Sequence, residues 1–104
     1  MDLSITTDSR PERCLISVCG EVDISNADAL REAIEKGFAL PSGEVCLDFS
    51  GVSYIDSTGI GVLVGAARRA SEGETRFAVE GVQANVMRIV QLLGVDKEMD
   101  ISAA

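Results

Sequence analysis

The chain of 104 residues contains no histidine, and this absence excludes several classes of chemistry. Without imidazole there can be no Ser-His-Asp triad, no His-ligated metal site and no imidazole acid–base catalysis. The sequence also lacks the Gly-x-Ser-x-Gly nucleophile elbow and the Gly-x-x-x-x-Gly-Lys phosphate loop. We therefore expect a protein that is not an enzyme and that holds neither a metal ion nor a cofactor.

Cysteine is scarce as well. Cys14, Cys19 and Cys46 form an odd set without a Cys-x-x-Cys spacing, which is typical of neither a disulfide framework nor a zinc site. Cys14 and Cys19 should point to opposite faces of one strand, so they cannot bridge to each other. Contact of either one with Cys46 across neighbouring strands stays an open alternative. The simplest interpretation is that all three are small apolar strand residues.

Positive charge is limited, with nine basic residues against seventeen acidic ones and a formal net charge of -8. An acidic chain without a basic cluster repels phosphate backbones and anionic lipid surfaces, so nucleic acid and membranes are poor partners. A basic protein surface is a good partner for such a chain. No apolar stretch approaches the length of a membrane span, and no basic region followed by an apolar run opens the chain. These features predict a cytoplasmic protein.

What the sequence does contain is a regular alternation of short apolar segments and amphipathic segments, which predicts one domain over residues 1–104. A hairpin followed by alternating helices and strands gives a mixed sheet with right-handed crossovers. If the strands lie in sequence order, the helices fall on one face. The periodicity predicts strands at 3–6, 14–19, 45–47 and 76–79, and helices at 24–38, 57–70 and 86–93.

Several single residues mark the expected boundaries of these elements. Ser25 and Asp28 are spaced as an approximate capping box for the first helix. Gly81 is expected to break the fourth strand, and Gly94 to close the last helix. Val95 is expected to pair briefly at the sheet edge.

The chain is organised around residues 48–63, where an apolar run stops, a polar cluster intervenes and a second apolar run begins. We interpret this stretch as the end of a strand, a loop and the start of a helix. Asp56 or Ser57 is the natural N-cap, because the first helical N–H groups have no partner inside the helix. Gly59 and Gly61 would each cost roughly 1 kcal/mol relative to alanine in an ordinary helix. Their presence indicates that backbone or another molecule comes close there.

The sequence DFSGVSYIDSTGIGVL at residues 48–63 resembles the signature of STAS domains of the anti-sigma factor antagonist (anti-anti-sigma factor) family. Gly20-Glu21-Val22-Asp23 resembles the second recurrent motif of that family, at a fitting distance upstream. The resemblance implies an α/β fold of the STAS type, with a mixed β-sheet of four to five strands and three main helices packed largely on one face. Many relatives carry a further C-terminal helix, for which this chain has little room before Ala104. The expected state is a monomer or weak homodimer.

The resemblance also implies a bacterial phosphoprotein that regulates transcription in a stress response by partner switching. The dephosphorylated protein binds an anti-sigma factor that is a serine kinase, which frees the sigma factor. Phosphorylation of the serine that follows the aspartate, here Ser57, dissolves the complex, and a serine phosphatase resets it. By the same resemblance, the partner-binding residues are Asp23, Asp56, Ser57, Thr58, Gly59 and Gly61.

Other interpretations of these residues stay open. Ser57 could only cap a helix, Thr58 competes as acceptor, and Asp23 could be a plain strand-end cap. Asp48 is best explained as a polar strand-end residue, since the acidic pair and the lysine of a phospho-aspartate receiver are not found. Two rival functions remain: a STAS scaffold of a stressosome or lipid-transporter assembly that is never phosphorylated, and a module that presents the helix start at Ser57 to a nucleotide phosphate.

Overall fold

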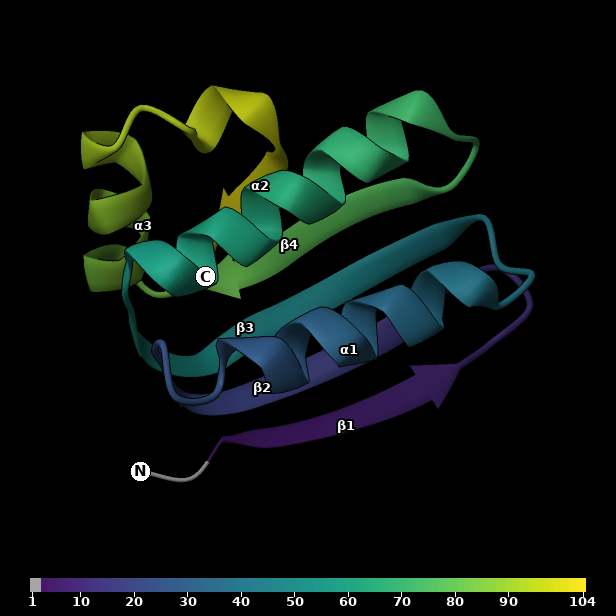
Figure 1. Cartoon of the computed structure of the whole chain (residues 1–104), viewed down its shortest axis with the longest axis horizontal. Coiled ribbons are helices and arrows are strands. Elements are labelled where there is room, and N and C mark those ends of the chain that lie inside the picture. The colour runs from purple at the N-terminus through teal and green to yellow at the C-terminus, as the bar shows by residue number, and fades with distance from the viewer. Residues whose placement is uncertain (1–2) are drawn as a thin grey trace.

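The computed structural model describes residues 3–104, which form a five-stranded sheet in the order β1-β2-β3-β4-β5. β1 pairs antiparallel with β2, and all later neighbours pair parallel, so the sheet is mixed as predicted (Figure 1). The strands are β1 Ser4–Ser9, β2 Cys14–Val22, β3 Glu44–Ile55, β4 Arg76–Val82 and β5 Asp100–Ala103.

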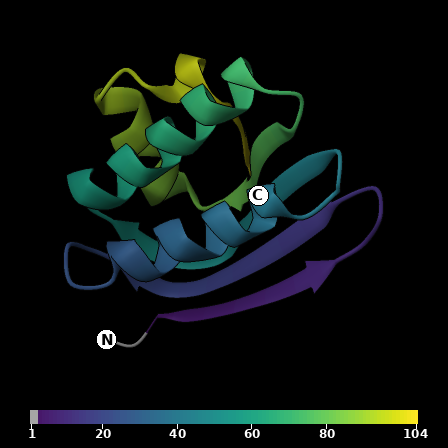
Figure 2. The same ribbon diagram turned by 45° about the vertical axis from the view of Figure 1, so that its right-hand side comes forward.

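Three α-helices connect the parallel strands: α1 Ala27–Ala39, α2 Ser57–Glu72 and α3 Ala84–Leu92. A short 3₁₀ helix, η1 Asp96–Glu98, precedes β5. α1 and α2 cross the same face of the sheet, and α3 stands at one end of it (Figures 1 and 2). Right-handed crossovers between strands in sequence order place the helices this way, and the predicted fold class is confirmed. Among residues 3–104, no helix is both long and apolar enough to cross a membrane.

One hydrophobic core lies between the helices and the sheet. Alternate residues of β2 and β3 supply its floor, since successive strand side chains point to opposite faces. Ile16, Leu47 and Phe49 are fully buried there, and Leu30 of α1 and Leu63 of α2 close the core from above. Burying a side chain of this size stabilises the fold by about 1.5–3 kcal/mol. This core fixes how α1 and α2 sit over the sheet.

The structure corrects the ends of all four predicted strands: β1 continues to Ser9 and not only to residue 6, and β2 to Val22 and not only to residue 19. β3 does not end at Leu47: it continues to Ile55, and Val22 of β2 pairs with Ile55 at its far end. The segment from 48 to 55 is therefore strand and not loop, because β2 continues beside it and Val52 is fully buried. Two register shifts in the pairing of β2 with β3, each with one extra residue in β3, accommodate the irregular sequence. β4 likewise continues through Gly81, whose φ of 70° bends the strand without ending it.

The expected capping box at Ser25 and Asp28 was also wrong. α1 begins at Ala27 with Asn26 as its N-cap, and no side chain there bonds the first turn. Val95 does not pair at the sheet edge but precedes η1, and β5 begins only at Asp100. Gly94 does follow α3 with a φ of 73°, in agreement with its predicted place.

The opposite face of the sheet carries polar and charged residues. On this face Nη1 of Arg13 lies 3.9 Å from Oε1 of Glu44 and 4.0 Å from Oε2 of Glu80. Burial, with a smaller contribution from Glu80, raises the pKa of the Cys46 thiol to about 12. Within the described chain all three cysteines are free thiols; Cys14 and Cys46 are buried and Cys19 is exposed. The Cys46 thiol is therefore unreactive at neutral pH, because the thiolate is the reactive form.

Candidate functional site

The carboxylate of Asp56 holds two segments together at the start of α2. Asp56, one of the two predicted candidates, is the N-cap, and its Oδ1 accepts a hydrogen bond of 3.0 Å from the Gly59 N–H. Its Oδ2 accepts a second bond of 3.1 Å from the N–H of Ile24, 32 residues earlier. The Asp56 N–H in turn donates to the Val22 carbonyl at 3.0 Å. One residue thus fixes the helix start against the end of β2.

The connection between β2 and α1 is held just as firmly. Asp23 Oδ1 accepts hydrogen bonds from the Ser25 N–H, at 2.9 Å, and from the Ser25 hydroxyl. The Asn26 side chain accepts from the Asp23 N–H at 2.9 Å and donates to the Glu21 carbonyl at 2.9 Å. The bonds from Ser25 lower the pKa of Asp23, so this carboxyl is ionised at neutral pH. The loop at 23–26 is therefore a fixed, negatively charged surface.

Ser57 is the first residue of α2 and is exposed, whereas the neighbouring Thr58 is half-buried. The bond from the Ile24 N–H to Asp56 brings the predicted residues Asp23, Asp56 and Ser57 to one end of the sheet. A negative group on Ser57 would meet the partial positive charge of the helix N-terminus. The arrangement offers an accessible hydroxyl on a rigid support, with carboxylates as neighbours.

The two glycines singled out in α2 have different environments. A Cβ at Gly59 would lie 2.7 Å from side-chain atoms of both Ile55 and Val22, so packing inside the protein requires this glycine. A Cβ at Gly61 would meet nothing within 4 Å, and the residue is exposed. The close approach that we expected at Gly59 is thus made by the chain itself. Contact of either glycine with a partner stays a prediction.

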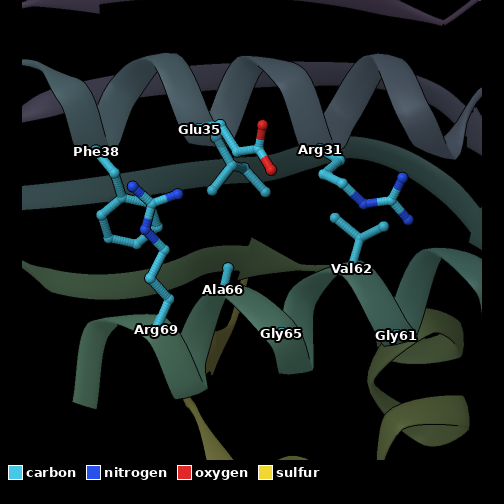
Figure 3. Close-up of a pocket in the computed structure, with 9 residues that line it drawn as sticks. Arg31, Glu35, Phe38, Gly61, Val62, Gly65, Ala66 and Arg69 are labelled. Atoms are coloured by element: carbon cyan, nitrogen blue, oxygen red, sulfur yellow. The ribbon is translucent and has the colours of Figure 1, made fainter. Parts of the chain in front are cut away.

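Gly61 opens onto a groove of about 240 Å³ between α1 and α2 (Figure 3). Arg31 and Arg69 point toward its two ends, with Glu35 between them. The Arg69 guanidinium lies 5.0 Å from the centre of the Phe38 ring, a cation–π contact. The groove therefore has basic groups at both ends and an acidic group between them, and Arg31 is also paired with Asp28 of α1.

No group of three or more His, Cys, Asp or Glu side chains within residues 3–104 is arranged to hold a metal ion.

Comparison with known proteins agrees with this geometry. The profile of the family described as "Mlab, STAS domain" matches residues 5–101. An anti-sigma-B factor antagonist of Listeria monocytogenes is 31% identical over 103 residues, covering 97% of this chain and 90% of that protein. The chain belongs to the STAS-domain family of anti-sigma factor antagonists.

Solved STAS structures have the same fold. An anti-sigma factor antagonist from Mycobacterium paratuberculosis superposes with a TM-score of 0.87 at 25% identity, over 99% of this chain and 87% of that one. The phosphorylated form of the Bacillus cell fate determinant SpoIIAA superposes with a TM-score of 0.71 at 20% identity, over 96% of this chain and 92% of that one. The latter similarity shows the fold alone.

Some features of this STAS site were missed from the sequence. Ile24, whose backbone is tied to Asp56, and Asn26, which braces the loop, were assigned only to the start of a helix. Arg31 and Arg69 line the same groove only because α1 packs beside α2.

Proposed function

We propose that this protein is an anti-sigma factor antagonist that works by partner switching, with Ser57 as its phosphoacceptor. In the dephosphorylated state it binds an anti-sigma factor that is a serine kinase and thereby releases a sigma factor in the bacterial cytoplasm. A serine phosphatase restores this state. The single observation that carries the proposal is the exposed hydroxyl of Ser57 at a helix start that Asp56 holds rigidly against the β2–α1 loop.

Ser57 is a substrate in this scheme and not a catalyst. The γ-phosphoryl group leaves ATP and bonds to Oγ of Ser57, the hydroxyl proton passes to a base of the kinase, and ADP departs. Asp56 is not suited to be that base, because both of its carboxylate oxygens already accept backbone hydrogen bonds. The protein itself needs only to present the hydroxyl, which agrees with its lack of histidine.

The phosphoryl group adds about -1.5 to -2 charges beside Asp23 and Asp56. The free protein tolerates this charge, because the helix N-terminus attracts anions and water solvates the group. In a complex the same charge would be desolvated and would face the partner. Repulsion and desolvation then favour dissociation, which is the switch.

The test is to incubate the protein with ATP and the anti-sigma factor kinase of the same genome, and to measure intact mass and map the modified peptide. We expect one phosphoryl group, at Ser57, and none on Ser57→Ala. Thr58→Ala is the matched control and should accept the group as wild type does. Phosphate on Thr58, or full phosphorylation of Ser57→Ala, would overturn the assignment.

A second candidate is a passive STAS subunit of a larger assembly, such as a lipid transporter or a stressosome. The description of the matching family profile as "Mlab, STAS domain" favours it. In that case Ser57 only supports the helix start, and Ser57→Asp would assemble as wild type does. The absence of any phosphate after incubation with the kinase would favour this candidate.

A further inference from the structure

Ile24 is an unusual residue at the end of the sheet that carries Ser57. Its side chain is 79% exposed, although hydrophobic side chains of its size in this protein are mostly buried in the core. Scattered exposed hydrophobic residues are common on protein surfaces, so exposure alone decides nothing. The position of Ile24 is more informative than its exposure, because its backbone N–H is bonded to Asp56, the residue that precedes the proposed phosphoacceptor.

The loop that carries Ile24 is rigid. Asp23 accepts bonds from Ser25, Asn26 braces the backbone on both sides, and the Ile24 N–H is held by Asp56 at 3.1 Å. These bonds fix the backbone that carries the exposed side chain of Ile24. An exposed apolar group on a fixed backbone binds with a small entropy cost, because the loop is already ordered.

The groups around Ile24 indicate what it contacts. The carboxylates of Asp23 and Asp56 flank it and carry the negative charge there, since the exposed Asp28 on the first turn of α1 is paired with Arg31. A single apolar side chain within a negatively charged rim is complementary to an apolar pocket bordered by basic side chains. Contacts of this kind, with an apolar centre from which polar groups at the rim exclude water, carry most of the affinity in protein interfaces.

We propose that Ile24 is the apolar anchor of the complex with the anti-sigma factor, filling a pocket of that partner whose border is basic. This inference rests on the proposed function and adds to it the residue that supplies affinity next to the switch. The phosphoryl group on Ser57 then acts close to the anchor, because Asp56 joins Ser57 and the Ile24 loop. The nearby charge would have to be desolvated each time the anchor enters its pocket.

The test measures affinity between the purified protein and the same anti-sigma factor by calorimetry, with ATP omitted. Ile24→Ala should weaken binding by about tenfold or more, as expected for a central anchor. Ile24→Met keeps the apolar volume and should stay within about threefold of wild type. Leu92→Ala is the matched control, because Leu92 is also 79% exposed but lies at the end of α3. It should bind as wild type does.

The possible outcomes separate the anchor from the function. If wild type binds and Ile24→Ala binds equally well, the anchor is refuted while the proposed function stands. If Leu92→Ala loses as much affinity as Ile24→Ala, the contact is not local to the loop and the anchor is again refuted. If wild type itself does not bind, the proposed function fails and the anchor with it. Thermal melts of the free variants should coincide with that of wild type, since neither side chain is buried.

Discussion

The first two turns of α2 have an inner and an outer side whose residues have different reasons for being there. On the inner side Gly59 leaves no room for a side chain, and Leu63 is fully buried. On the outer side Ser57 is exposed, and Gly61 has open space where a side chain could stand. Packing within the chain explains the inner residues. It does not explain the glycine at position 61, where contact with a partner stays a prediction.

The largest effect on stability is expected on the inner side. Leu63→Ala removes a fully buried side chain and leaves a cavity, so the free energy of unfolding should fall by about 2–5 kcal/mol. Urea denaturation measures it. Ser57→Ala on the outer side is the control and should change stability by less than about 0.5 kcal/mol. Equal losses for the two variants would remove the distinction between the sides.

Gly59→Ala tests the inner side without removing any contact. The new methyl group would clash with Val22 and Ile55 at 2.7 Å, and overpacking of this kind costs about 1–3 kcal/mol. The better helix propensity of alanine offsets about 1 kcal/mol of this loss in the free energy of unfolding. We expect a net loss of stability, visible as a lower denaturation midpoint. A variant more stable than wild type would show that the contact relaxes easily.

Asp56→Asn separates the two functions of one residue at the boundary between the sides. Asparagine caps helices as well as aspartate does, so the bond to Gly59 should survive. The side-chain amide cannot accept from the Ile24 N–H, so the tether to the loop is lost, at about 0.5–1.5 kcal/mol. Hydrogen exchange should show a faster amide at Ile24 with Gly59 still protected. If the Ile24 amide of the variant exchanged as slowly as the Gly59 amide, the hydrogen bond from Ile24 to Asp56 would not be what protects it.

The smallest effect is expected at Gly61 and has the opposite sign. Gly61→Ala should stabilise the free protein by about 0.5–1 kcal/mol, because alanine is the better helix former and nothing lies within 4 Å of the new carbon. Affinity for the anti-sigma factor should fall if the partner approaches the backbone there. Melting temperature and calorimetry together measure both effects. A variant that gains stability and keeps full affinity would place Gly61 outside the interface.

The same division shows what could be predicted from the sequence. The start of α2 depends on local rules: the sequence limited the N-cap to Asp56 or Ser57, and the structure has Asp56 as the N-cap and Ser57 as the first helical residue. The length of β3 depends on pairing with β2, a contact between distant segments, so residues 48–55 were taken for a loop. Local turn signals at Ser50 and Gly51 were outweighed by the burial of Val52.

The candidate site was predictable to a similar extent. The resemblance to the family indicated Asp23 and Ser57, while the bond between Asp56 and Ile24 required the fold to bring residues 32 positions apart together. The outward direction of Ile24 could not be predicted, because it results from the bonds made by Asn26 and Asp23 and not from any periodic pattern. Local rules thus gave the helix start, the resemblance gave the predicted acceptor, and tertiary structure gave the surroundings of Ser57.

The central claim is that the outer side of α2 is a charge-operated switch, and Ser57→Asp tests it most directly. The helix N-terminus favours the new charge by about 0.3–1 kcal/mol at an exposed site, which offsets repulsion from Asp23 and Asp56, so thermal melts should match those of wild type. In the complex the charge faces the partner, at a cost of about 2–5 kcal/mol, so calorimetry should show affinity for the anti-sigma factor reduced by about thirtyfold to several thousandfold. Matching melts with equal affinities would contradict the switch and leave the passive STAS subunit as the better explanation.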